Sequence, residues 1–275
     1  MDSFRRGDLR FDVRDGGPPD GEPVVLLHGF PQDAAGWAAV EALLHAAGLR
    51  TLAPDQRGYS PGARPRGRGA YRMSECVADV LALLHAAGLA SAHVVGHDWG
   101  GAVGWWLGSD HPGRVRTLTV LSTPHPAAMR RAWLGRQGFR SWYLGAFQVP
   151  YLPEWRLRDR LFAVRTLTAS GLPRDHAERY AARLAEPGAA TAMLNWYRAI
   201  PWSVRSPAGR SRVPTTYVWG SRDFALGRRA AEGTARYVAA PYAFVELAAG
   251  HWLPEADADA VAEHVIARVA SLGTL

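Results

Sequence analysis

Short apolar runs and stretches of helical periodicity alternate along most of the chain. Continuous apolar runs are typical of strands covered on both faces of a parallel sheet, and apolar residues at intervals of three and four are typical of helices that bury one side. Strands are predicted at 9–13, 24–27, 49–54, 94–95, 115–121, 215–219 and 243–247, and helices at 37–47, 76–87, 102–107, 228–238 and 257–270. The first strand alternates only weakly, so we expect it at an edge. This order indicates an α/β fold with a mostly parallel, doubly wound sheet.

Two of the predicted helices share the same ending. The sequence Leu-Leu-His-Ala-Ala-Gly-Leu occurs at 43–49 and again at 83–89. A glycine that follows the last helical residue commonly closes a helix, so Gly48 and Gly88 are predicted to do so here. Ser74 is the predicted N-cap of the second helix.

The alternation stops between about 124 and 207. This stretch is rich in aromatic residues, has helical periodicity and contains no clear strand. We therefore expect a helical cap inserted into the core. It would divide the chain into a first core segment at 1–123, the cap at 124–207 and a second core segment at 208–275.

The overall charge invites a nucleic-acid interpretation that the sequence does not support. The formal net charge is +7, but every basic side chain is an arginine, and no basic run is interleaved with aromatic residues. We expect no nucleic-acid partner. Cys76 is the single cysteine, so an internal disulfide is impossible.

The chain contains no segment typical of export or membrane insertion. Residues 1–14 are charged and lack the apolar centre of a signal peptide, and no apolar span reaches the ~18 residues that a membrane helix needs. We expect a cytoplasmic protein without a membrane partner.

The stretch at 93–107 carries the strongest chemical signal. An apolar run meets Gly96, Asp98 follows between His97 and Trp99, and two glycines precede a buried helix. This is the strand–turn–helix pattern of a nucleophile elbow, with aspartate at the position that hydrolases more often give to serine. The positive end of the helix would favour a carboxylate there. The alternative reading of Asp98 is a helix N-cap.

Two further residues follow in the order expected of a catalytic triad. Asp223 and His251 come after the last two predicted strands, where ligands bind in open parallel sheets. A histidine held by a carboxylate can take a proton from water. The string Gly-Tyr-Ser-Pro-Gly at 58–62 also matches a serine elbow, but it lies in a loop, and proline supplies no backbone N–H after Ser60.

Several segments together resemble epoxide hydrolases of the α/β-hydrolase fold, over most of the chain from residue 23 onward. The matching segments are His-Gly-Phe-Pro at 28–31 (an HGxP turn), 55–60 (a DxRGYG-S loop), 96–101 (the nucleophile), 223–226 (the acid), 250–252 (the base) and Leu-Asn-Trp-Tyr-Arg at 194–198 (an NWYR segment). The departures are small. Gln32 and Asp33 follow the HGxP turn, and Ser60 stands where glycine is usual.

The resemblance implies the α/β-hydrolase fold, with the cap inserted after the sixth strand, and an enzyme that converts an epoxide to a vicinal diol. Asp98 would form a covalent ester, and His251, held by Asp223, would activate the water that hydrolyses it. Oxyanion donors would be the backbone N–H groups of Phe30 and Trp99.

The resemblance also implies two ring-opening tyrosines in the cap. Tyr197 matches through the NWYR segment. Tyr143 matches through a Tyr-x-x-x-Phe-Gln-x-Pro run, a less specific signal because Tyr151 and Tyr180 lie in the same segment. The expected pocket residues are His28, Pro31, Trp196 and Trp252. An apolar or aromatic epoxide and water are the expected reactants, with no cofactor and no metal, in a monomer or homodimer.

Two other functions use the same features. Haloalkane dehalogenases share an Asp-Trp-Gly elbow, but they hold the halide with an asparagine after His-Gly or with a second tryptophan, and Phe30 occupies the first of these places. The cap tyrosines instead favour an oxygen leaving group. A catalytically silent ligand-binding protein on this fold is the second alternative.

Overall fold

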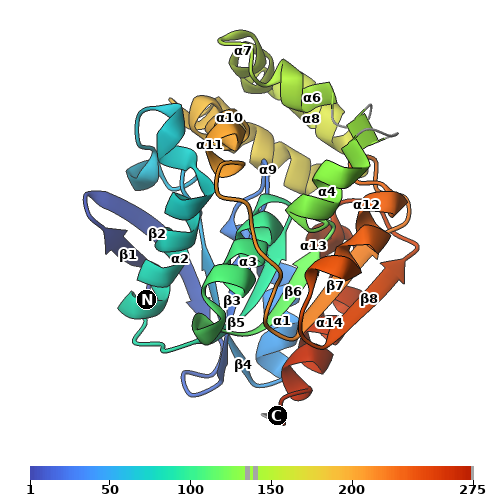
Figure 1. Cartoon of the computed structure of the whole chain (residues 1–275). Coiled ribbons are helices and arrows are strands. Elements are labelled where there is room, and N and C mark those ends of the chain that lie inside the picture. The colour runs from blue at the N-terminus through green and yellow to red at the C-terminus, as the bar shows by residue number, and fades with distance from the viewer. Residues whose placement is uncertain (134–136, 139–141, 274–275) are drawn as a thin grey trace.

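Eight strands form one sheet in the computed structural model, which describes residues 1–133, 137–138 and 142–273 (Figure 1). The strands are β1 (Ser3–Arg6), β2 (Leu9–Gly16), β3 (Glu22–Leu27), β4 (Leu49–Pro54), β5 (Ala92–His97), β6 (Val115–Leu121), β7 (Thr215–Gly220) and β8 (Tyr242–Leu247). Their order is β1-β2-β4-β3-β5-β6-β7-β8. Only the pairs β1–β2 and β2–β4 are antiparallel. The predicted mostly parallel sheet of the α/β-hydrolase fold is therefore confirmed.

Helices cover both faces of the sheet. They are α1 (Ala38–Ala46), α2 (Met73–Ala86), α3 (Trp99–Asp110), α12 (Arg228–Gly233), α13 (Leu253–Ala256) and α14 (Ala258–Ala270). On one face Trp37 and Leu44 pack with Val265 of α14, and on the other Val80 of α2 packs with Trp105 of α3. The doubly wound architecture follows from these two apolar layers.

Two details of the expected secondary structure are wrong. The 9–13 strand lies inside the sheet, because β1 forms the edge, held by the stacked rings of Phe4 and Phe11. Ser74 does not cap α2, which begins one residue earlier. The Met73 N–H instead donates to Oγ of Ser203, 130 positions along the chain, so its partner comes from tertiary structure. Gly48 and Gly88 do follow their helices, with φ of 81° and 69°.

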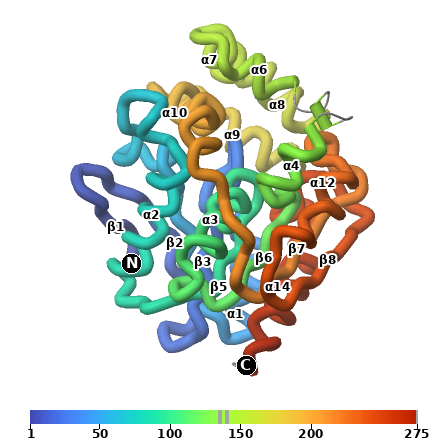
Figure 2. The backbone as a smooth tube through the Cα atoms, in the orientation of Figure 1, coloured from blue at the N-terminus to red at the C-terminus, as the bar shows by residue number. Residues whose placement is uncertain are grey.

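The segment between β6 and β7 contains seven described helices joined by turns and loops, and it follows the sixth strand, as predicted. Its helices are α4 (Pro126–Ala132), α6 (Trp142–Ala146), α7 (Leu152–Arg158), α8 (Arg160–Ala169), α9 (Arg174–Ala185), α10 (Ala189–Arg198) and α11 (Ile200–Ser203). We call residues 124–207 the helical insertion. Figure 2 shows α6–α10 at one end of the molecule, above the strands of the sheet. None of the helices described here is long and apolar enough to cross a membrane.

Polar contacts hold the helical insertion on the core. The indole N–H of Trp196 in α10 donates to the carbonyl of Arg57 at 2.7 Å. From α9, Arg183 pairs with Asp55 at 2.7 Å, and the Tyr180 hydroxyl donates to Glu255 at 2.6 Å. These bonds place α9 and α10 relative to the strand ends.

Candidate active site

Asp98 occupies a sharp turn between β5 and α3. Its φ of 50° and ψ of −117° lie outside the regions that most side chains adopt. Tight packing imposes this geometry: a Cβ on Gly100 would lie 2.1 Å from the carbonyl oxygen of Leu27 in the neighbouring strand. The strained turn presents Asp98 at the carboxyl edge of the sheet, as the elbow pattern predicts.

The two oxygens of the Asp98 carboxylate have different surroundings. Oδ1 accepts the backbone N–H of Phe30 at 3.0 Å. Oδ2 faces His251, whose Nε2 lies 3.9 Å away. Burial raises the pKa of Asp98, while His251 and the N–H groups of Phe30 and Trp99 oppose that rise. The N–H groups predicted for an oxyanion hole therefore both act on this carboxylate.

His251 is held by Asp223, as the sequence predicts. Nδ1 of His251 lies 2.8 Å from Oδ2 of Asp223. The other carboxylate oxygen of Asp223 accepts the N–H groups of Ala225 at 2.7 Å and Leu226 at 3.0 Å. Burial lowers the pKa of His251, but the charges of Asp223 and Asp98 outweigh it and raise the pKa to about 9. A pKa in this range favours the protonated form of His251 at neutral pH, with a carboxylate on each side of the ring.

Behind His251 lies a buried polar chain that the sequence analysis did not identify. The His251 carbonyl accepts the Ser122 hydroxyl at 2.9 Å and lies 2.9 Å from Nε2 of His97. Nδ1 of His97 lies 2.8 Å from Oε1 of Gln32, and Nε2 of Gln32 donates to Glu255 at 2.7 Å. Gln32, which departs from the family pattern, was the one available signal. These hydrogen bonds hold the backbone of His251. They also connect it to α9, because Glu255 accepts the hydroxyl of Tyr180.

Tyr143 and Tyr197 both face the space above Asp98. The Tyr197 ring lies edge-on to the rings of Phe30 and Trp99, with centroids 5.3 and 5.0 Å away. The Tyr143 ring is 6.1 Å from that of Tyr197. Burial is the main cause of a raised pKa at both hydroxyls, and the negative charge of Asp98 adds to it. Both phenols therefore keep their protons at neutral pH.

The other two tyrosines that compete with Tyr143 have different positions. Tyr151 is 84% exposed, and Tyr180 donates its hydroxyl to Glu255. Neither lines the two cavities that reach Asp98. Of the tyrosines in the helical insertion, Tyr143 and Tyr197 are the pair that the structure brings together at the carboxylate.

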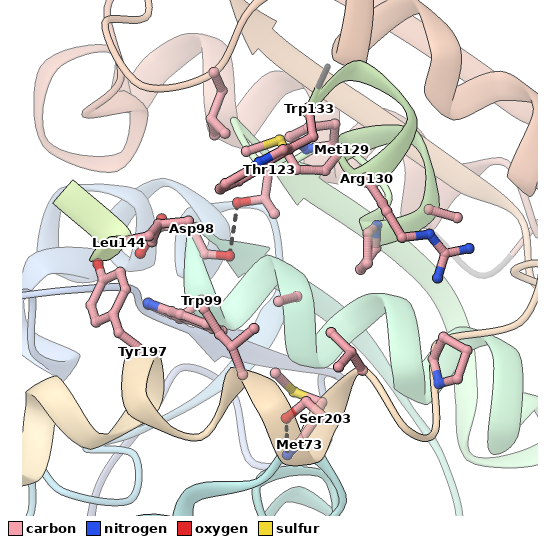
Figure 3. A pocket seen from close by; sticks show the side chains of 18 of the residues that line it. Met73, Asp98, Trp99, Thr123, Met129, Arg130, Trp133, Leu144, Tyr197 and Ser203 are labelled. Atoms are coloured by element: carbon pink, nitrogen blue, oxygen red, sulfur yellow. Dashed lines mark hydrogen bonds between the residues drawn. The ribbon is translucent and has the colours of Figure 1, made fainter. Parts of the chain in front are cut away.

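Two cavities meet at Asp98, Tyr143 and Tyr197. One, of about 300 Å³, extends toward α4 and α11 and has apolar walls that include Trp106, Met129 and Ile200. In Figure 3, Tyr197 and Trp99 lie on one side of Asp98, and Met129 and Trp133 lie on the other. The second, of about 940 Å³, lies beneath α6 and α8 and beside His251. The carboxylate and the two phenols stand where the cavities join.

The expected pocket residues divide into two groups. Pro31 and Trp252 line the larger cavity, whereas His28 and Trp196 are buried and line neither cavity. Nε2 of His28 accepts the N–H of Gln56 at 3.1 Å, so this side chain joins two core loops. Trp196 packs behind Trp99 and bonds to the 55–60 loop. His28 and Trp196 therefore support the cavity walls from behind. The prediction that they line the pocket is wrong.

Ser60 has a structural role. Its hydroxyl donates to the Asp55 carbonyl and accepts the Asp12 N–H, both at 2.9 Å, and the side chain is fully buried. Its rejection as a nucleophile agrees with this position. Within the described ranges, no three or more histidine, cysteine or acidic side chains are grouped as a metal site would require.

Comparisons with known proteins place these features in a family. A family model described as alpha/beta hydrolase fold matches residues 22–258. The AB hydrolase superfamily protein YfhM of Bacillus subtilis is 36% identical over 254 residues, which cover 89% of each chain. Epoxide hydrolase A of Mycobacterium tuberculosis is 31% identical, with 90% of each chain covered. The crystal structure of epoxide hydrolase A from Mycobacterium thermoresistibile superimposes with a TM-score of 0.84, at 26% identity and 97% coverage of both chains.

Proposed function

Since the chain belongs to the α/β-hydrolase fold family and is a hydrolase of that superfamily, we propose that it opens epoxides to vicinal diols through an ester on Asp98. One observation carries the proposal: two protonated phenols, Tyr143 and Tyr197, face the same cavity junction as the half-buried carboxylate of Asp98. An epoxide needs this combination, because its oxygen leaves as an alkoxide unless a donor supplies a proton. The helical insertion acts as the cap that brings the phenols there.

In the first step Oδ2 of Asp98 attacks an epoxide carbon. Oδ1 is occupied by the Phe30 N–H, which leaves Oδ2 free to form the new C–O bond. The ring C–O bond breaks with its electron pair going to oxygen, and one of the two phenols gives that oxygen a proton. Such proton transfer contributes about 10²- to 10⁴-fold to the rate.

In the second step water gives a proton to Nε2 of His251 and attacks the carbonyl carbon of the ester. The tetrahedral intermediate then breaks its bond to the alkyl oxygen, which takes a proton and leaves as the second hydroxyl of the diol, and the Asp98 carboxylate is restored. The distance of 3.9 Å between Oδ2 and Nε2 of His251 exceeds a hydrogen bond, so Nε2 is available to take a proton from a water molecule that approaches the ester.

Formation of the ester removes the negative charge of Asp98, so His251 loses part of the interaction that raised its pKa and gives up its proton. That proton restores the phenol that the first step turned into a phenolate, and the neutral imidazole is then the base. The N–H groups of Phe30 and Trp99 then stabilise the tetrahedral oxyanion, where one donor is worth roughly 3–4 kcal/mol.

The cavity walls favour an apolar substrate. The smaller cavity is lined mainly by aliphatic and indole side chains, with Thr123, Arg130 and Ser203 among them. Phe30, Phe147 and Trp252 add aromatic surface to the larger cavity. Similarity to mycobacterial proteins named epoxide hydrolases supports epoxides as the substrates. We propose aromatic or aliphatic epoxides without charged groups as the substrates.

The deciding experiment is intact-mass analysis of His251→Gln after incubation with styrene oxide or with a bromoalkane, in separate samples. Without its base the protein is expected to stall at the ester, with a mass gain equal to the whole epoxide. The double variant Asp98→Asn/His251→Gln is the matched control and is expected to gain nothing.

Other results would replace the proposal. Gain of the alkyl group with release of bromide, and no reaction with the epoxide, would identify a dehalogenase. Binding of styrene oxide by the wild-type protein with neither an adduct in His251→Gln nor diol formation would identify a ligand-binding protein.

A further inference from the structure

The positive charge of the chain is concentrated in one part of the helical insertion. Residues 126–170 contain eight arginines and two acidic residues, which accounts for nearly all of the formal net charge of +7. The arginines are therefore not spread evenly along the chain, although no basic run interleaved with aromatic residues was found when a nucleic-acid partner was considered. A surface of one sign attracts partners of the opposite sign.

Large apolar side chains are exposed in the same region. Trp155 of α7 is 65% exposed and Leu161 of α8 is 71% exposed; Trp142, Tyr151 and Leu152 are also exposed. Isolated exposed apolar residues are ordinary, but a group of this size at one place indicates an interaction site. We call these five residues, with Arg156, Arg158, Arg160 and Arg165, the insertion tip.

The arginines of the insertion tip have no acidic partners among the described residues. All four are exposed, and none takes part in an ion pair there. The two nearby acids are already engaged: Glu154 pairs with the buried Arg198 at 2.5 Å, and Asp159 accepts the N–H of Phe162 at the start of α8. The guanidinium of Arg156 lies over the rings of both Trp155 and Phe162, so charge and aromatic surface are interleaved.

From this combination we propose that the insertion tip docks on an anionic lipid membrane surface. Tryptophan, tyrosine and leucine enter the boundary between headgroups and acyl chains, while arginines bind the headgroup phosphates. Figure 1 shows α6, α7 and α8 at the end of the molecule farthest from the chain termini, where no other element stands in front of them. A peripheral contact of this kind needs no spanning helix, and it departs from the expectation of no membrane partner.

The positive charge of the insertion tip favours an anionic membrane over a second copy of the chain as the partner. A symmetric dimer through the insertion tip would bring the same four arginines of each copy together. Like charges facing one another across an interface cost several kcal/mol, and Asp159, an exposed carboxylate that already accepts the N–H of Phe162, is too little to offset four arginines from each copy. The anionic lipid surface satisfies both the charge and the apolar side chains.

The larger cavity opens toward the same surface. Trp142, Phe162 and Arg165 line the cavity and belong to the helices that carry the insertion tip. Docking would therefore turn the opening of the cavity toward the membrane, where apolar small molecules concentrate. The docking itself does not depend on the reaction catalysed.

The test is co-sedimentation of the wild-type protein with phosphatidylcholine vesicles containing about one quarter phosphatidylglycerol, and with pure phosphatidylcholine vesicles. Binding to the anionic vesicles is expected, with a sharp decrease near ~0.5 M salt as screening sets in. Arg156→Gln/Arg158→Gln/Arg160→Gln is expected to reduce the partition coefficient about 100-fold, at about fivefold for each arginine. Leu152→Gln/Trp155→Gln/Leu161→Gln is expected to reduce it at least about tenfold.

The matched control is Arg5→Gln/Arg229→Gln/Arg236→Gln, which removes the same charge from exposed positions elsewhere. It is expected to bind anionic vesicles within about threefold of wild type, since charge near the surface falls off over a Debye length. Three outcomes would overturn the proposal: no binding to anionic vesicles, an equal loss in the control, or a dimer in light scattering that the Leu152, Trp155 and Leu161 changes abolish without vesicle binding. Binding to a DNA duplex that is insensitive to those apolar changes, without vesicle binding, would assign the arginines to nucleic acid instead.

Discussion

The residues at the strand ends and the residues of the helical insertion reach the same cavity junction by different means. Asp98 and Asp223 are held by backbone N–H groups of their own loops or of the neighbouring loop. Tyr197 and Tyr143 are held by ring packing and by helices whose positions depend on a few polar bonds to the core. The first group is fixed by local backbone geometry, and the second by the docking of one layer on another.

The catalytic groups therefore differ in how precisely their atoms are positioned. Backbone hydrogen bonds and strained turns position an atom within a few tenths of an ångström, which a nucleophile and its base require. A proton donor for a leaving oxygen tolerates a looser arrangement, particularly when two donors face the same place. We therefore expect changes at the strand ends to be more damaging than changes in the insertion.

The largest expected effect is at Asp98. Asp98→Asn keeps the shape and tolerates the positive φ, but an amide does not form the ester, so kcat should fall by about 10⁴-fold or more. Steady-state diol formation from styrene oxide measures this loss. Urea unfolding serves as the control, because a free energy of unfolding unchanged to within about 1 kcal/mol separates lost chemistry from lost folding. Turnover close to that of wild type would contradict the role of the elbow.

Smaller effects are expected when the hydroxyls of the two cap tyrosines are removed. Tyr197→Phe should lower kcat about 100-fold and Tyr143→Phe about 10-fold, because Tyr197 is the one packed directly against Phe30 and Trp99. The double variant should lose up to about 10⁴-fold. Single-turnover ester formation, followed by mass in the His251→Gln background, measures the affected step. Tyr151→Phe is the matched control at an exposed tyrosine. An equal loss of kcat in this variant would mean that Tyr197 and Tyr143 have no special role as proton donors.

The cation at His251 predicts how stability depends on pH. Its pKa of about 9 in the folded protein exceeds the ordinary value of 6.5, so the folded state holds the proton more tightly. The stabilisation is complete below pH 6.5 and is lost as pH rises through 9, a decrease of roughly 3 kcal/mol in the free energy of unfolding. Urea titrations at these two pH values measure it. His251→Gln should flatten this change, and a wild-type profile that rises instead would contradict the assignment.

Local patterns account for what the sequence predicted well. The turn at Asp98, the glycines around it and the order of Asp223 and His251 are encoded within a few residues of each site. The edge strand β1 escaped detection because Phe4 is its one buried residue, and its partner Phe11 lies in the next strand. A short strand with a single apolar contact has no periodicity to reveal it.

The remaining errors come from long-range contacts. The first N–H of α2 donates to Ser203, which lies in α11, far along the chain. A capping rule that considers only neighbouring residues does not detect this partner. His28 and Trp196 belong to segments typical of a pocket, yet their ring nitrogens bond to core loops behind its wall. The chain from His97 through Gln32 to Glu255 also joins three separate segments. Whether a residue lines the cavity or lies behind its wall depends on tertiary packing. The local sequence pattern does not carry that information.

The smallest expected effect tests the bond that joins the two regions. Tyr180→Phe removes the hydroxyl that donates to the buried Glu255 and leaves Gln32 as the remaining donor to that carboxylate. The free energy of unfolding should fall by about 1.5–3 kcal/mol, the contribution of one hydrogen bond to a charged group. Because Asp98 and His251 keep their own backbone supports, kcat should change only about two- to threefold. Urea unfolding and diol formation measure the two effects, with Tyr151→Phe again as the control. A loss of kcat as large as that of Tyr197→Phe would mean that this one bond positions the helical insertion over the nucleophile, and that the two regions are not independent.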